Sequence, residues 1–190
     1  MASDVVEQQL SREELQALRN KRTGLAIFQV SWIMVFVVLI VVNLQLRNDA
    51  PSWPPPGVDQ LSLIIPTLMT LALILSSFLV RQGTQAIKAG EYGRFLSQWR
   101  IAIGLGTLFV VVMALEWIAV PTSGQYSNLF RLMVGFHGVH ALVIGGFLVN
   151  VYRHGDQYDP LHFWPAEAAA NLWYFVTVAW LLFFVVLYVI

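Results

Sequence analysis

Long uninterrupted runs of apolar residues dominate the chain and are separated by short polar connections. Five such runs cover residues 24–46, 61–80, 101–120, 129–152 and 168–190. Each run approaches or exceeds the roughly 20 apolar residues that a transmembrane helix needs. The alternation of apolar and polar residues that marks the strands of a membrane β-barrel is not seen in them. The pattern therefore predicts an all-α polytopic membrane protein, built as a bundle of five transmembrane helices.

The composition agrees with this class. Hydrophobic residues make up 57% of the chain and charged residues only 12%, which is too apolar for an ordinary soluble domain. The apolar runs leave no stretch long enough for a separate soluble domain, and a formal net charge of +0 offers no basic surface for nucleic acid. Cysteine is absent from the sequence. Disulfides, thiolate metal sites, thiol catalysis and covalent c-type haem attachment are thereby excluded.

Residues 1–23 form a polar tail, and the membrane domain is expected to cover residues 24–190. The tail does not resemble a cleavable signal peptide, because Asp4 precedes any apolar run, whereas a signal peptide opens with basic and then apolar residues. Ser11 and Glu14 have the spacing of a capping box, which marks the first turn of a helix. We therefore expect a short surface helix in the tail.

Lysine and arginine are distributed unevenly among the connections between the apolar runs. The 47–60 and 121–131 connections contain one arginine each, whereas the tail and the 81–100 connection are rich in basic residues. These residues are Arg12, Arg19, Lys21 and Arg22 in the tail, and Arg81, Lys88, Arg94 and Arg100 in the connection. Basic connections stay on the cytoplasmic side of a membrane. We therefore expect the N-terminus and the tail inside and the C-terminus outside.

Two histidines lie inside the fourth apolar run. His137 and His140 are three residues apart, so they share one face of a helix. Ionisable residues at membrane depth are costly, and they mark either function or a protein contact that shelters them. Haem ligation would need an axial ligand from a second helix, and the other histidines, His154 and His162, fall in the loop at 153–167. The same helix carries small residues that allow a close neighbour: Gly135, Gly138, Ala141 and Gly145.

Both histidines are therefore expected to face protein and to hydrogen-bond a neighbouring helix, a subunit or a lipid headgroup. Glu116, near the end of the third run, has two interpretations: a carboxylate at a helix end that reaches interfacial water, or a paired or lipid-shielding carboxylate inside the bundle. Glu167 precedes the last helix, where the helix dipole favours a negative charge. Tyr174, Thr177 and Trp180 share one face of that helix, as is typical of a contact between helices.

No motif for catalysis or metal binding is evident. The loop residues His154, Asp156, Asp159 and His162 match no specific metal site in their spacing. The chain contains no phosphate-binding loop, no nucleophile next to a base and no H-E-x-x-H sequence. We therefore expect neither a catalytic residue nor a bound cofactor or metal in this chain.

Several short motifs, taken together and in order, resemble subunit III of the haem-copper terminal oxidases (cytochrome c oxidase), in its shorter five-helix bacterial form. The segment W-P-P-P-G at 53–57 resembles the family's W-P-P-x-G loop, and G-F-H-G-V-H at 135–140 resembles its T-G-F-H-G-L-H helix from the glycine onward. The other matching positions are Thr70, Ser76, Ser77, Gly90, Glu91, Gly106, Glu116, Trp117, His162, Phe163, Glu167, Trp173, Phe175, Val176 and Trp180. The likeness covers nearly the whole chain after the tail.

The chain also departs from the family at several positions. Trp32 stands where the family usually carries a buried glutamate in this helix, so a role that rests on that carboxylate does not transfer. The remaining departures are Met69 for Asn, Met113 for Gln, Val134 for Thr, Tyr174 for His and Thr177 for Asp.

The resemblance implies a non-catalytic subunit of a proton-pumping respiratory complex in the bacterial plasma membrane. Haem and copper would reside in partner subunits I and II. This subunit would pack on subunit I, bind structural phospholipid and sustain proton uptake and stability during oxygen reduction. Residues expected at subunit or lipid contacts are Glu116, His137, His140, Glu167, Trp173 and Trp180, with Glu116 near the histidines. Lipid headgroups are expected near the basic residues Arg81, Arg94 and Arg100.

Two alternatives remain open. Similar five-helix proteins accompany nitric-oxide reductases within the same superfamily. The chain could also be a small proton-coupled transporter or channel subunit that uses Glu116, His137 and His140 as a relay. The transporter interpretation lacks the inverted-repeat symmetry and the interrupted helices that such folds show.

Overall fold

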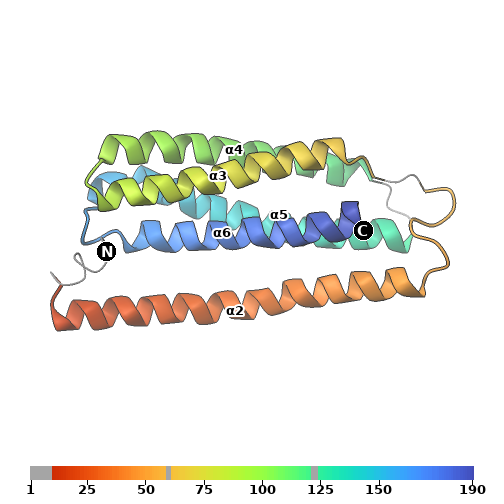
Figure 1. Ribbon diagram of the computed structural model, residues 1–190, viewed down its shortest axis with the longest axis horizontal. Helices are drawn as coiled ribbons and strands as arrows, with labels where there is room; N and C mark the ends of the chain where they lie inside the picture. Colours follow the sequence, from red (N-terminus) through yellow and green to blue (C-terminus); the bar gives the residue numbers. More distant parts are fainter. Residues whose placement is uncertain (1–9, 59–60, 121–123) are drawn as a thin grey trace.

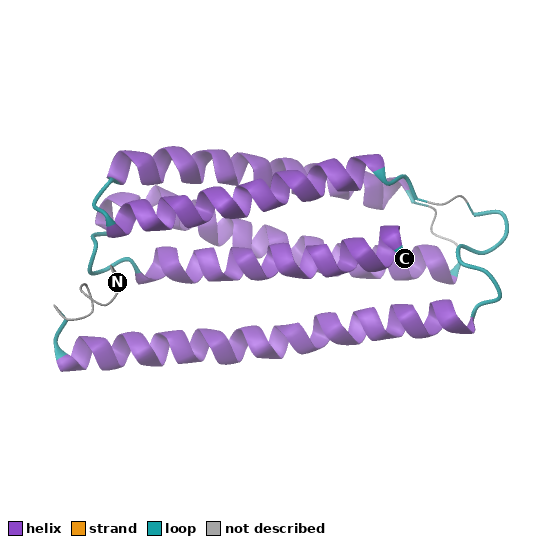
Figure 2. Cartoon of the chain, viewed as in Figure 1, coloured by secondary structure: helices purple, strands orange, loops and turns teal. Residues whose placement is uncertain are grey.

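The computed structural model describes residues 10–58, 61–120 and 124–190, and this part of the chain contains helices and loops but no strand (Figures 1 and 2). The long helices are α2 (Arg12–Asp49), α3 (Ile64–Lys88), α4 (Tyr92–Ala119), α5 (Gln125–Arg153) and α6 (Trp164–Phe184). A 3-10 turn, η1 (Gly155–Gln157), follows α5, and a π-helical turn, η2 (Val185–Val189), extends α6. Each expected apolar run falls largely on one long helix, and within the described ranges 5 helices are long and apolar enough to cross a membrane. The predicted all-α, five-span fold is confirmed.

Helix α2 runs as one helix of 38 residues, so the tail does not form a separate short surface helix. Its first turn is capped as the spacing predicts: Oγ of Ser11 accepts from the backbone N–H of Glu14 at 3.3 Å, and the Glu14 carboxylate accepts from the Ser11 N–H at 2.9 Å. No proline follows until Pro51, so nothing breaks the helix between the tail and the apolar run. Residues 1–9 of the tail, with Asp4, lie outside the described residues.

Helices α3, α4, α5 and α6 form a four-helix group. Helix α3 packs on α4, α4 on α5, α5 on α6, and α6 back on α3. The largest fully buried side chains inside this group are aromatic: Trp99, Trp173, Trp180, Phe95 and Phe109. Lipid tails are as apolar as these side chains, so the group is held by tight packing and by polar contacts between helices.

Helix α2 lies beside the four-helix group and contacts it mainly through α6 (Figure 1). Only 6% of its most apolar stretch is buried within the chain, compared with 44% for the last span. Phe36 is the main buried apolar side chain of α2, and its ring lies 5.3 Å from that of Phe175 and 5.2 Å from that of Phe183. Most of the surface of α2 is therefore left for lipid or for other chains.

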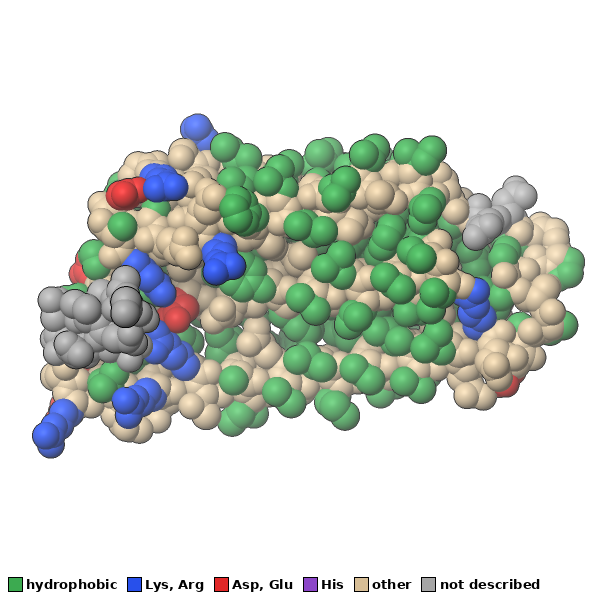
Figure 3. All heavy atoms as spheres, in the orientation of Figure 1, with side chains coloured by type: hydrophobic (Ala, Val, Ile, Leu, Met, Phe, Trp, Pro, Cys, Tyr) green, Lys and Arg blue, Asp and Glu red, His purple; other side chains and the backbone are tan. Residues whose placement is uncertain are grey.

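The surface has an apolar middle and one basic end. Figure 3 shows apolar side chains over the middle of the visible face and most of its lysine and arginine side chains at the end where α2 begins. At the opposite end, Trp53 anchors the loop between α2 and α3, with its ring centroid 5.1 Å from that of Tyr126 on α5. Charge is thus concentrated at one of the two ends that would face water.

Candidate functional site

Indole and hydroxyl groups join α3 to α6 through the middle of the bundle. Nε1 of Trp180 donates to Oγ1 of Thr70 at 2.8 Å, and Nε1 of Trp173 donates to Oγ of Ser76 at 3.0 Å. The Ser76 hydroxyl in turn donates to the carbonyl of Ala102 on α4 at 2.8 Å. Buried Trp side chains need a partner for the indole N–H, and the hydroxyls of α3 supply it. Trp173 and Trp180 thus serve as contacts between helices within the chain.

A third contact joins α3 to α6, and the three contacts together form the α3–α6 seam. The hydroxyls of Ser77 and Thr177 share a hydrogen bond of 2.6 Å, and Thr177 also donates to the carbonyl of Trp173 at 3.1 Å. Of the three residues predicted to share a contact face of α6, Thr177 and Trp180 bond hydroxyls of α3, and Tyr174 is partly buried against the core. Sequence alone did not identify α3 as the partner.

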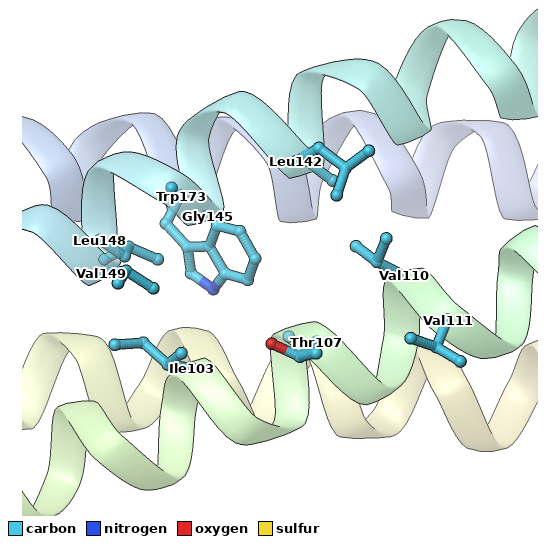
Figure 4. Close-up of a pocket in the computed structure, with 12 residues that line it drawn as sticks. Ile103, Thr107, Val110, Val111, Leu142, Gly145, Leu148, Val149 and Trp173 are labelled. Carbon is cyan, nitrogen blue, oxygen red and sulfur yellow. The ribbon is translucent and has the colours of Figure 1, made fainter.

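Trp173 fits because a facing helix carries glycine. A Cβ added at Gly106 of α4 would lie 2.6 Å from Cζ2 of Trp173, closer than atoms can approach, whereas one at Gly145 of α5 would lie at 3.7 Å. Figure 4 shows the indole between α4 and α5, beside Gly145. Position 106 therefore requires glycine for as long as Trp173 keeps this place.

His137 is enclosed by aromatic rings and is only 1% exposed. Its ring centroid lies 5.3 Å from that of Trp180, 6.0 Å from Phe109 and 6.2 Å from both Phe36 and Phe183. Neither ring nitrogen has a hydrogen-bond partner in the part of the chain that the structure describes. The histidine does face protein, but the hydrogen bond expected to a neighbouring helix is not found.

His140 is also buried, and it faces α2. Its Nδ1 donates to the carbonyl of Phe136, one turn earlier in α5, at 2.6 Å. The indole of Trp32 meets the imidazole edge to face, with 4.0 Å between ring centroids, and Phe36 lies at 5.3 Å. Trp32 therefore occupies the space beside His140 at the position where the resembling family carries glutamate.

Glu116 is half-buried, and its carboxylate accepts a hydrogen bond from the hydroxyl of Tyr188 at 3.0 Å. The bond joins the end of α4 to η2, so the carboxylate is paired and lies near a helix end. No contact between Glu116 and either histidine is found among the described residues, and Tyr188 and Trp180 lie between them. The ring of Trp180 stands 6.5 Å from that of Tyr188 and 5.3 Å from that of His137. Tyr188 was not singled out from the sequence, although a hydroxyl near the end of its apolar run was a signal.

Arg131 and Trp117 form a second contact near this end of α4. Nε1 of Trp117 donates to the carbonyl of Arg131 at 2.7 Å, and Nη1 of Arg131 donates to the carbonyl of Val120 at 2.8 Å. The guanidinium carbon lies 4.2 Å from the centroid of the Trp117 ring. This cation–π geometry holds a positive charge level with the end of α4.

Glu167 lies in the first turn of α6, as predicted, and also pairs with α2. Nη2 of Arg22 lies 3.0 and 3.1 Å from its two carboxylate oxygens, and both side chains are more than half covered. Nearby, Nε2 of Gln29 donates to the carbonyl of Asn171 at 3.1 Å. These bonds attach the basic end of α2 to α6.

The three arginines expected to meet lipid lie on the surface at the basic end. Arg81 and Arg100 are exposed, near the end of α3 and in the first turns of α4. Arg94 pairs with Glu91 at 3.2 Å, but both side chains are more than half exposed. Such exposed pairs contribute little to stability, so these guanidinium groups stay accessible to an anion.

The loop before α6 is shaped by Asp159. Its carboxylate accepts the backbone N–H groups of Leu161 and His162 at 2.7 Å each, and Nδ1 of His162 donates to it at 3.1 Å. These bonds, the one from the His162 side chain above all, hold the pKa of Asp159 below its usual value. Across the described ranges, no three His, Asp or Glu side chains gather as metal ligands. The polar residues of this loop are thus accounted for by a turn.

An apolar groove follows the contact between α4 and α5. One part has a volume of about 210 Å³ and is lined by residues that include Ile103, Thr107 and Trp173 (Figure 4). A second part, of about 300 Å³, lies further toward the end of α4 and reaches Trp117. Val110 and Leu142 line both parts, so the two meet there.

Comparisons with known proteins agree with this architecture. The family model described as cytochrome c oxidase subunit III matches residues 4–190. Cytochrome c oxidase subunit 3 of Synechocystis sp. is 29% identical over 174 residues, which cover 88% of this chain and 74% of that protein. The subunit 3 of Thermostichus vulcanus is 32% identical over 174 residues, covering 88% and 86%. That of Marchantia polymorpha is 32% identical over 179 residues, covering 88% and 67%.

Proposed function

The chain belongs to the cytochrome c oxidase subunit III family, and we propose that it is a cofactor-free accessory subunit of a respiratory haem-copper oxidase. The observation that carries this proposal is the family match over residues 4–190, which takes in every helix. The polar groups inside the bundle add support, because hydrogen bonds between helices take up the indole and hydroxyl groups of Trp173, Trp180 and Thr177. In this proposal haem and copper belong to partner subunits I and II, and oxygen reduction belongs to the assembled complex.

The proposed placement in the complex has the basic end inside and the C-terminus outside, in a bacterial plasma membrane. The concentration of lysine and arginine at the start of α2 and around the α3–α4 turn supports this orientation. Helix α2 offers an apolar surface that its own chain leaves bare, since 6% of its most apolar stretch is buried. Subunit I and structural lipid are proposed to cover exposed apolar surface of this kind.

The basic end also supports a role at the inner membrane surface. Exposed guanidinium groups of Arg81, Arg94 and Arg100 suit the phosphates of lipid headgroups, because each basic group near an anionic leaflet adds about 1 kcal/mol of attraction. An ordered lipid layer and a basic surface at this end are proposed to sustain proton uptake by the complex over many turnovers and to stabilise it.

Purification in mild detergent tests the proposal. The tagged chain should co-purify with haem-containing subunits in a complex that consumes oxygen, and the separated chain should contain neither haem, copper nor zinc. A tagged membrane protein of another family serves as the control for non-specific recovery. A complex that consumes nitric oxide instead would indicate a nitric-oxide reductase partner. Recovery of the chain without any haem protein, or stoichiometric metal in the separated chain, would overturn the proposal.

A further inference from the structure

We propose that the groove between α4 and α5 binds one acyl chain of a phospholipid whose phosphate pairs with Arg131. The inference rests on the proposed function only in requiring that the chain spans a bilayer. It places a lipid at the end of the bundle opposite Arg81, Arg94 and Arg100, apart from the lipids proposed above.

The distance along α4 from the level of Arg131 to the point where the two parts of the groove meet matches the thickness of one leaflet. Nη1 of Arg131 donates to the carbonyl of Val120 at 2.8 Å, so its guanidinium lies level with the end of α4. From Val120 to Val110, where the two parts of the groove meet, α4 rises about 15 Å at about 1.5 Å per residue. Half of a hydrocarbon core of about 30 Å is the same distance. An acyl chain whose headgroup sits at Arg131 would therefore end near the meeting point.

The width of the groove fits a hydrocarbon chain and not a helix. The outer part of the groove, which is the part that reaches Trp117, has a volume of about 300 Å³. It is lined on α4 from Phe109 to Trp117, a length of about 12 Å, so its mean cross-section is about 25 Å². A helix with its side chains is about 10 Å or more across and needs several times that area. A partner helix could therefore lie over the groove but could not enter it.

The walls of the outer part are apolar and open toward the outside of the bundle. Gly138 has no atom within 4 Å of the position where a Cβ would stand, so its missing side chain leaves free space. Val139 and Leu142 beside it are 59% and 61% exposed. At this depth a membrane protein is surrounded by acyl chains. Moving one of them into an apolar groove therefore gains little free energy from the hydrophobic effect. Affinity must therefore come from the fit and from the headgroup.

Arg131 supplies the charge for that headgroup. Within residues 10–58, 61–120 and 124–190, no carboxylate forms an ion pair with it. One N–H group donates to the Val120 carbonyl, and the guanidinium carbon lies 4.2 Å from the centroid of the Trp117 ring. The other N–H groups of the planar fork are suited to phosphate oxygens. Trp and Arg side by side at the end of a span are also typical anchors at the level of lipid headgroups.

Photo-crosslinking in the assembled complex tests the site. The complex is placed in nanodiscs that contain phosphatidylglycerol with a diazirine near the methyl end of one acyl chain, and the adducts are located by mass spectrometry. Wild type should give adducts on the peptides that contain Val110 and Leu142. Gly138→Leu should lower their yield severalfold by filling the groove. Gly104→Leu is the matched control, because Gly104 is also an open glycine, on α4, and lies outside the groove.

A second pair of variants tests the charge and does not depend on Gly138→Leu folding. Arg131→Gln should reduce the yield with phosphatidylglycerol roughly tenfold relative to an uncharged lipid analogue, and Arg131→Lys should retain part of it. Equal yields from Gly138→Leu and Gly104→Leu would overturn the proposal. So would groove adducts that form on a neighbouring subunit instead of on this chain. Only complexes that keep their haem-containing subunits are compared, so a failed lipid site remains distinct from a failed proposed function.

Discussion

The indole of Trp32 meets the imidazole of His140 edge to face, with 4.0 Å between ring centroids and 83° between ring planes. This contact and the ring contacts of Phe36 join α2 to α5, whereas α2 packs mainly on α6. An aromatic contact here takes the place of the carboxylate that the resembling family carries at position 32. At position 32, the attachment of α2 to α5 therefore depends on the packing of aromatic rings.

This relationship can be measured with a double-mutant cycle of Trp32→Ala and His140→Ala. The expected coupling is about 0.5–1.5 kcal/mol, the value of an aromatic pair beyond its buried area. Reversible unfolding in mixed detergent micelles supplies the free energies. Val30→Ala is the control on the same helix, because Val30 is 59% exposed and should change stability little. Additive single mutants would contradict the contact.

The α3–α6 seam gives a second prediction. Trp180→Phe and Thr70→Val each remove the same 2.8 Å hydrogen bond, so each should lower the free energy of unfolding by about 0.6–2 kcal/mol. The double mutant should lose less than the sum of the two, because the bond is already absent after the first change. Thr67→Val is the matched control, since the Thr67 hydroxyl bonds the Leu63 carbonyl in its own helix. Full additivity would indicate that the two side chains do not interact.

Glycine at position 106 gives a third prediction. Gly106→Ala places a Cβ 2.6 Å from Trp173 and should cost about 1–3 kcal/mol through overpacking. Gly104→Ala, two residues earlier in α4, meets nothing within 4 Å and should be neutral or stabilise the helix by up to about 1 kcal/mol. The midpoint of thermal dissociation of the purified complex compares the two variants. An equal midpoint would mean that Trp173 does not occupy this place.

The two buried histidines should respond differently to leucine. Neither ring nitrogen of His137 bonds any of the described residues, so His137→Leu should change the stability of the chain by less than about 1 kcal/mol or raise it. His140→Leu removes the bond to Phe136 and the contact with Trp32, and should destabilise it. Unfolding and the haem spectrum of the complex are the measurements, and the spectrum should stay unchanged in both variants. A strong loss in His137→Leu would show that another chain supplies its partner.

The fold was predictable because a bilayer imposes a minimum length of apolar sequence on every span. The capping box of Ser11 and Glu14 also predicted the start of a helix at Arg12. The continuation of this helix into the first span was not predictable, since the polar tail carries no apolar signal. Burial of His137 and His140 followed from the cost of an imidazole in hydrocarbon. The residues that contact the two histidines were not predictable in this way.

Three of the contacts missed from the sequence cross between helices. Tyr188 meets Glu116, Arg22 meets Glu167, and Arg131 meets Trp117. Each depends on which helices are neighbours and on how far each is rotated about its axis, and apolar runs fix neither. An ionisable or hydroxyl side chain near the end of a run was the available signal in each case.

The length of α2 has a mechanical consequence. Its 38 residues span about 57 Å, whereas a bilayer with its headgroups is about 40–45 Å thick. When this helix stands along the bilayer normal, about 12 Å or more of its length therefore lies beyond the headgroups. This end of α2 is held at the start of α6, since Leu18 lines a pocket with Trp164 and Arg22 pairs with Glu167. A force on α2 near Arg12 would therefore act on α6 directly, without passing through any loop.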